Sequence, residues 1–168
     1  MVSHKAHMPE SQLNELREEV KASGILSFSF PHVGIFNSWL EAEWFKIESF
    51  IFRTKQLPNE SAIVFYQLIV EKEDNTSNPA DLNTRFFDAS WWVEKVEVYE
   101  RREIIDDELF AVGEELLFDH AIVFSLYLGE DKQRLCIGPM HWGGGLSATL
   151  DTKVIERIID GCRVRWSA

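Results

Sequence analysis

The chain has 168 residues, including 12 Phe and 6 Trp, which is too aromatic for a disordered polypeptide and enough for one large hydrophobic core. Its formal net charge is −11, which argues against binding nucleic acid or an anionic membrane surface, because both need clustered Lys and Arg. No apolar run approaches the roughly 20 residues that span a bilayer, and residues 1–8 lack a signal-peptide core. We therefore expect one cytoplasmic domain over residues 9–168, preceded by a flexible tail over residues 1–8.

The first third of the chain predicts a surface helix followed by a strand. Apolar residues in 9–22 recur at helical spacing as one narrow stripe, with Pro9 at the start and Gly24 just past the end. Residues 25–30 alternate between apolar and Ser side chains, as a half-buried strand does. Residues 37–55 fit both a helix and a strand, and we favour a helix that begins at Ser38.

The middle of the chain predicts a central strand, a long loop, a second strand and a helix. Residues 62–71 are β-branched and apolar on both faces, and residues 73–83 are dense in turn-forming residues. Residues 91–103 read as a strand with one exposed face. Residues 106–117 read as a helix, because their apolar residues align and their acidic start suits the helix dipole.

The clearest local pattern is a hairpin near the end of the chain. Two apolar runs, 121–128 and 133–137, are separated by the short polar sequence GEDK. Residues 152–160 predict a short helix, and residues 162–166 predict an edge strand. We therefore predict an α+β fold, a mostly antiparallel sheet with helices packed on one face, whose core includes four residues: Val64, Leu68, Phe124 and Leu135.

Residues 138–149 form a glycine-rich loop. His141 and Gly143–Gly145 resemble the His-Gly-Gly-Gly oxyanion loop of lipases and esterases, with Trp142 inserted. The family's G-x-S-x-G motif is absent, and no Lys-Ser or Lys-Thr follows the glycines to make a phosphate loop. We expect a connector without a catalytic role. The alternative is a small-ligand site or an unrecognised enzyme site built from six residues: His141, Trp142, Gly143, Gly144, Gly145 and Ser147.

Neither metal nor thiol chemistry is indicated by the sequence. The histidines and cysteines do not have the paired spacing of a zinc site, so we predict no metal and no cofactor. Cys136 lies within an apolar strand and Cys162 follows the last helix, so we expect both to be free and inert. No catalytic residues are assigned.

Acidic residues are concentrated in the segment 94–119, which holds ten acids and three bases. This segment is either a solvated face or a docking surface for a basic protein, with Tyr99, Trp91 and Trp92 as aromatic anchors. The predicted partner-binding residues are Glu94, Glu97, Tyr99, Glu100, Glu103, Asp106, Asp107 and Glu108. Our leading hypothesis is a non-enzymatic immunity protein that neutralises a basic toxin. A structural subunit of a larger assembly is a further alternative.

Overall fold

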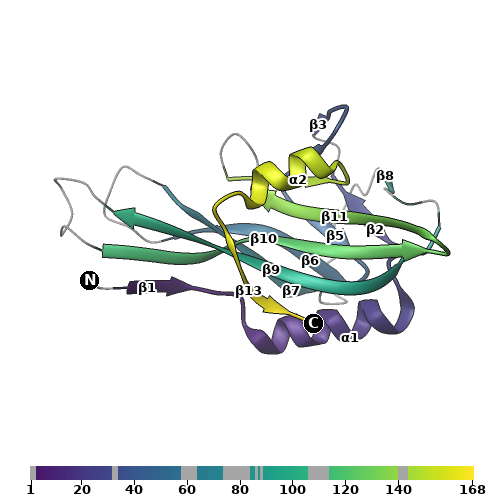
Figure 1. Cartoon of the computed structure of the whole chain (residues 1–168), viewed down its shortest axis with the longest axis horizontal. Helices are drawn as coiled ribbons and strands as arrows, with labels where there is room; N and C mark the ends of the chain where they lie inside the picture. Colours follow the sequence, from purple (N-terminus) through teal and green to yellow (C-terminus); the bar gives the residue numbers. More distant parts are fainter. Residues whose placement is uncertain are drawn as a thin grey trace.

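The computed structural model describes residues 3–31, 34–57, 64–73, 84–85, 87, 89–105, 114–139 and 144–168. In these ranges the chain forms one sheet-rich domain with two helices and mostly antiparallel strand pairing (Figure 1). The expected fold class is thus confirmed in its single domain and its antiparallel sheets, but the fold is closer to all-β than to α+β.

A large sheet contains the strands β13, β9, β10, β11, β12, β4 and β3 in this order, with β1 added beside β10. Their bounds are β1 Ser3–Ala6, β3 Gly34–Ile35, β4 Leu40–Ala42, β9 Trp92–Ile105, β10 Glu114–Leu128, β11 Asp131–Pro139, β12 Leu146–Thr149 and β13 Arg163–Ser167. β1 is parallel to β10, and the other pairs are antiparallel. Residues 3–6, expected in a flexible tail, therefore lie in a sheet.

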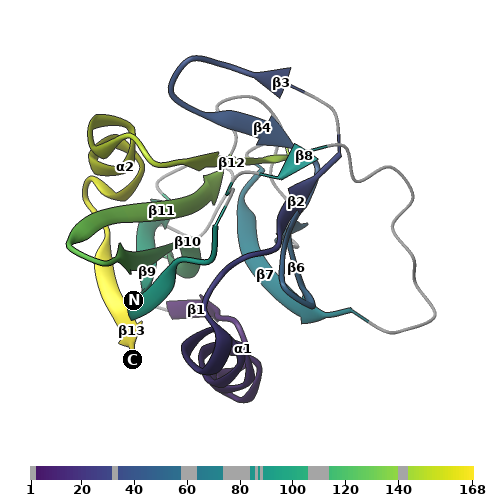
Figure 2. The same cartoon turned by 90° about the vertical axis from the view of Figure 1, so that its right-hand side faces the viewer.

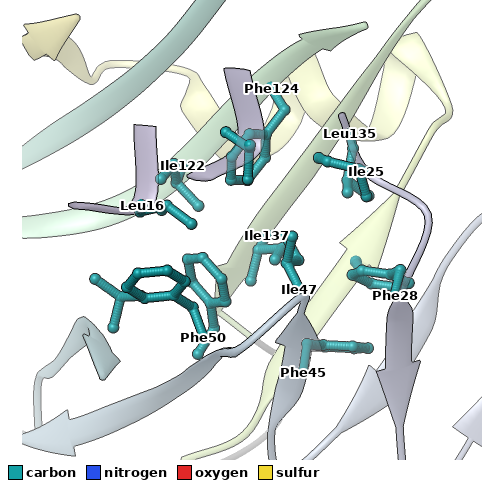
Figure 3. Packing of buried hydrophobic residues seen from close by; sticks show 14 of the residues in the cluster. Leu16, Ile25, Phe28, Phe45, Ile47, Phe50, Ile122, Phe124, Leu135 and Ile137 are labelled. Carbon is teal, nitrogen blue, oxygen red and sulfur yellow. The ribbon is translucent and has the colours of Figure 1, made fainter. Parts of the chain in front are cut away.

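A smaller antiparallel sheet faces the large one, with the strand order β7-β6-β5-β2-β8 (Figure 2). Its strands are β2 Phe28–Phe30, β5 Phe45–Ile47, β6 Phe50–Gln56, β7 Tyr66–Lys72 and β8 Thr84–Arg85. The main core fills the space between the two sheets, where Phe and Ile side chains from both interdigitate (Figure 3). Phe50 and Phe124, one from each sheet, are both completely buried.

The two helices lie on different sides of the large sheet. α1 (Glu10–Ser23) closes the opening between the sheets near β9 and β7, whereas α2 (Thr152–Ile159) covers the outer face of β10 and β11 (Figure 2). The prediction of helices on one face is therefore not supported. Both helices were nevertheless predicted at nearly the observed bounds. The apolar stripe of α1 is buried and consists of Leu13, Leu16 and Val20. Asp151 caps α2, because its side chain accepts hydrogen bonds from the backbone N–H groups of Lys153 and Val154.

The favoured helix at 38–55 is wrong, because this segment forms β4, β5 and β6. Its apolar residues alternate within short runs, and turns separate the runs. Glu48 makes the tight β5–β6 turn with a positive φ of 51°, and its carboxylate accepts the backbone N–H groups of Leu26 and Ser27 at 2.8 and 2.9 Å. This side-chain anchor stabilises a backbone conformation that is unfavourable for most residues other than glycine.

The predicted helix at 106–117 is also wrong where it can be compared, because residues 114–117 belong to β10; residues 106–113 lie outside the described part. β10 is longer than the predicted strand because β9 pairs with it from Glu114 onward. The predicted hairpin is confirmed. Gly129 takes a φ of 62° at the first position of its two-residue turn, a conformation that glycine adopts without steric cost.

Three of the four predicted core residues are confirmed. Leu68, Phe124 and Leu135 are at most 1% exposed. Val64 is 45% exposed and its prediction is wrong, because it precedes β7 rather than lying within it. β7 is moreover the edge strand of the smaller sheet, not a central strand.

Candidate partner-binding surface

Strand β9 carries five of the eight predicted partner-binding residues and divides them between the two faces of the large sheet. Val96, Val98 and Glu100 alternate along the inner face, which meets the core, whereas Glu97 and Tyr99 lie on the outer face. The predicted segment therefore does not form a single acidic surface. Its members have two different environments, one buried and one partly open.

Glu100, on the inner face, is only 2% exposed and does not reach the surface. Its carboxylate accepts hydrogen bonds from Arg163 Nε at 2.7 Å and from His7 Nε2 at 2.5 Å. Arg163 belongs to the edge strand β13, and His7 lies between β1 and α1. Glu100 thus connects two segments that are distant in sequence, and its role in the fold is structural.

Asp119 is the partner of Glu100 in the register between β9 and β10, and it is completely buried. Arg165 donates from Nε and Nη2 to its two oxygens at 2.6 and 2.8 Å, and the backbone N–H of Met8 donates to the same carboxylate. Arg165 lies at an irregularity in the pairing of β13 with β9. We call Glu100, Asp119, Arg163, Arg165 and His7 the buried ion cluster, after its two buried carboxylates; the Arg163 side chain itself is 72% exposed.

The outer face is open at the hairpin end of β10. Tyr127 lies beside Trp92 of β9 on one side and beside Lys132 of β11 on the other, so that these three side chains form one row across the sheet. Trp92 is 42% exposed and Tyr127 is 37% exposed. This end of the hairpin extends beyond α2, at the right of Figure 1. The two aromatic rings are therefore accessible on a rigid strand surface.

The next row contains Glu94 and Lys95, which lie at a register irregularity between β9 and β10. A β-bulge places two successive residues on the same face of a strand, and both of these side chains are exposed. Glu94 lies 3.8 Å from Lys132, and Lys95 lies 3.4 Å from Glu97. We define the outer patch as the residues Trp92, Glu94, Lys95, Tyr127 and Lys132.

α2 covers the part of the outer face next to the outer patch, on the side away from the hairpin turn. Ile155 packs with Tyr99, Val123 and Cys136 into a second, smaller core beneath the helix. Burial raises the pKa of the Tyr99 hydroxyl, and the nearby carboxylate of Glu97 raises it further. Tyr99 was predicted as an aromatic anchor, but its side chain packs largely within the chain, beneath α2. Trp91 is half-buried and packs against the main core, so only Trp92 of the three predicted anchors is exposed.

The acids of segment 94–119 that the structure describes lie next to basic side chains. Arg101 contacts Glu103 at 2.5 Å, Arg102 contacts Glu115, and His4 lies 3.6 Å from Glu114. Several of the basic partners, including Lys132 and the two arginines of β13, come from outside the segment. Asp106, Asp107 and Glu108 lie outside the described residues. The local excess of charge in the sequence is therefore partly compensated in the fold.

The glycine-rich loop is only partly described. His141, Trp142 and Gly143 lie outside the described residues. Gly144 approaches the ring of Tyr66 so closely that an added Cβ would lie 2.9 Å from it, and its carbonyl accepts the hydroxyl of Thr54. Ser147 follows Gly145, is 6% exposed on β12, and donates its hydroxyl to the carbonyl of Pro139 at 3.0 Å. The described half of the loop therefore joins the two sheets, and its serine is engaged within the fold.

Burial shifts the pKa values of both cysteine thiols and of the His120 imidazole away from neutral pH. Burial raises the pKa of the Cys136 thiol to about 12, and burial also raises that of Cys162. Both cysteines are free, as expected. Burial lowers the pKa of His120 to about 4, with a further lowering by Arg101 and an opposing hydrogen bond with the backbone of Ile158. At neutral pH these thiols are therefore protonated and His120 is uncharged.

The described residues contain no group of three or more His, Cys, Asp or Glu side chains that could hold a metal ion. None of the helices in the described ranges is long and apolar enough to cross a membrane.

The comparisons with known proteins found no relative. No family model matches the chain, and no curated protein or solved structure matches it.

Tyr127 and Lys132 were not among the residues predicted for this surface. The hairpin pattern was a usable signal, because strand alternation fixes which residues of 121–128 face away from the core. The pairing of Trp92 with Tyr127 depends on the register and on the bulge in β9, and neither could be read from the sequence.

Proposed function

We propose that this protein is a non-enzymatic protein-binding domain that neutralises a basic toxin, in the manner of an immunity protein, through the outer patch and the adjacent Glu97. The observation that carries the proposal is the pair of exposed aromatic residues, Trp92 and Tyr127, on neighbouring positions of a rigid sheet. Tyr and Trp are enriched among the residues that contribute most to protein–protein binding.

Carboxylates outnumber ammonium groups around the two rings, with Glu94, Glu97, Glu130 and Asp131 against Lys95 and Lys132, and this excess suits a basic protein surface. Glu94 lies in the neighbouring row of the sheet, further from the hairpin turn. Glu130 and Asp131 are exposed at the hairpin turn itself. A polar and charged rim around aromatic residues is the usual anatomy of an interface. The chain as a whole carries a net charge of −11, which would speed encounter with a positively charged partner at low salt.

Four of the eight residues singled out in the sequence have distinct roles in this proposed function. Glu94 and Glu97 supply carboxylates at or beside the outer patch. Glu100 supports β9 from the buried side, and Tyr99 supports it through packing against α2. Contact residues are thus separated from supporting residues, and this separation can be tested by mutation.

The test uses the protein as bait for its partner in an extract of the source cells. The wild type and the double variant Trp92→Ala/Tyr127→Ala are compared under identical conditions. The matched control is Phe36→Ala, because Phe36 is also an exposed aromatic residue of the large sheet region, at 46% exposure, but lies near the β3 edge. A basic protein retained by the wild type and the control, and lost by the double variant, is the expected result.

The same partner is then purified and its association rate measured as salt is raised. We expect the rate to fall with salt and to fall further in the variant Glu94→Lys/Glu97→Lys, with little change in melting temperature. Co-production with the partner should also protect the host cell from its toxicity. Equal retention by the wild type and the double variant, or a partner without toxicity, would contradict the proposal.

A further inference from the structure

The outer patch combines two kinds of group that recognise cations in different ways. Trp92 and Tyr127 occupy directly paired positions on one face of β9 and β10. Side chains in such a pair have Cβ atoms about 4.5–5.5 Å apart, and both of these rings are exposed on the outer face. The face of an aromatic ring attracts a cation, most strongly when the cation is weakly hydrated.

The carboxylate of Glu94 lies beside these two rings and is only weakly engaged within the chain. Its contact with Lys132 Nζ is 3.8 Å long, and the two side chains are 56% and 70% exposed. An ion pair of this length between exposed side chains contributes little and is easily exchanged. Lys132 therefore acts as an intramolecular cation that a better-fitting donor can replace.

From this arrangement, and resting on the proposed function, we propose that the outer patch recognises an arginine side chain of the basic partner in preference to lysine. The planar guanidinium can lie flat on the ring of Trp92 or Tyr127 while its N–H groups form paired hydrogen bonds to Glu94. A lysine ammonium group is compact and strongly hydrated, and it cannot make both contacts with the same geometry. Arginine would displace Lys132 from Glu94 when the partner docks.

The experiment is a nuclear magnetic resonance titration of the isotope-labelled full chain with two short peptides. The peptides have the same length and charge, and one carries two arginines where the other carries two lysines. The reporter is the indole N–H of Trp92, assigned by its absence from the spectrum of Trp92→Phe. The internal reference is the indole N–H of Trp39, which already donates to Glu41 at 3.1 Å. We expect the arginine peptide to bind about fivefold more tightly, with shifts at Trp92 and not at Trp39.

Two variants separate this mechanism from general charge attraction. Lys132→Gln should strengthen binding of the arginine peptide about two- to threefold, because it frees Glu94. Lys55→Gln changes the net charge equally but lies on β6 in the other sheet, so its effect should be smaller. Trp92→Leu/Tyr127→Leu keeps apolar residues at both positions and should abolish the difference between the two peptides, as followed at the backbone N–H of Lys132, the neighbour of Tyr127.

The outcomes distinguish this inference from the proposed function. Equal, salt-sensitive binding of both peptides at the outer patch would overturn the arginine preference and leave a basic-partner surface. Binding of neither peptide at Trp92 would overturn the inference, and equal retention of the partner by the wild type and the double variant in the bait experiment would overturn the proposed function. An arginine preference that persists in Trp92→Leu/Tyr127→Leu would also overturn the inference, because the aromatic rings would then have no part in it.

Discussion

Glu100 and Asp119 lie directly opposite each other on β9 and β10, and both carboxylates are buried. Two carboxylates on neighbouring positions repel each other, so the arrangement requires nearby positive charge. Arg163 and Arg165 of β13 supply this charge. His7 and the backbone N–H of Met8 complete the remaining contacts from the other end of the described chain. The buried ion cluster therefore holds β13 and the segment after β1 against the central strands.

Asp119→Asn should destabilise the protein strongly. The substitution keeps the shape of the side chain but leaves Arg165, which is largely buried, without its counter-charge. Removing the charge of one partner in a buried ion pair lowers the free energy of unfolding by roughly 3–5 kcal/mol. Urea denaturation measures this loss. The control is Asp131→Asn at the exposed hairpin turn, where a change below about 0.5 kcal/mol is expected. Similar losses in the two variants would contradict the assigned role of Asp119.

Stability should fall as the pH is lowered from 7 to 5, in part through His120. Its folded-state pKa of about 4 lies below the ordinary value of 6.5, so the unfolded chain binds the proton more readily. The contribution of His120 to the free energy of unfolding is fully present above pH 6.5, and it is lost as the pH falls toward 4. Between pH 7 and pH 5 the loss is about 2 kcal/mol. Denaturation midpoints of the wild type and His120→Gln measure it, and a variant with the same pH slope as the wild type would refute this prediction.

Cys136 should resist thiol reagents in the folded protein. The thiol is completely buried beneath α2, and its pKa of about 12 keeps it protonated at pH 8. The thiolate is the reactive form, so modification should require unfolding. Mass spectrometry after brief treatment with an excess of reagent, with and without urea, gives the extent of labelling at each cysteine. Rapid labelling of Cys136 without urea would show that α2 opens readily.

Glu48→Ala should destabilise the β5–β6 turn by about 2 kcal/mol. It removes two hydrogen bonds to backbone N–H groups and leaves an alanine at a positive φ of 51°. Glu48→Gly should recover part of this loss, because glycine tolerates the conformation. Glu43→Ala, at an exposed position between β4 and β5, is the matched control. Equal stability of the alanine and glycine variants would show that backbone conformation makes no contribution.

The local parts of this fold were readable from the sequence, and the long-range parts were not. α1, α2 and the β10–β11 hairpin have caps, turn residues and spacing that act within a few residues. The segment 38–55 was misread because Leu40, Trp44 and Ile47 have helical spacing by coincidence across the connection between β4 and β5. Tertiary pairing with neighbouring strands decided its structure, which local propensity cannot report.

The candidate surface was predicted only in part for the same reason. Glu94, Glu97 and Trp92 were identified from the composition of one segment. The burial of Glu100 depends on Arg163, which lies 63 residues away, and the exposure of Trp92 beside Tyr127 depends on strand register. A count of charges along the sequence does not include basic partners that arrive from other strands.

β10 contacts strands from both ends of the described chain, and this has a consequence for how the protein reaches its native state. Met8 meets Asp119 across 111 positions of sequence, and Arg165 meets the same carboxylate across 46. Contacts of such long range slow folding, because a large loop must close before any stabilisation is gained. During synthesis on the ribosome, β10 would emerge well before β13, and Asp119 would await its arginine. β13, which leaves the ribosome after β10, thus completes the neutralisation of the buried Asp119 carboxylate, and chains interrupted before residue 165 should remain open to chaperones and proteases.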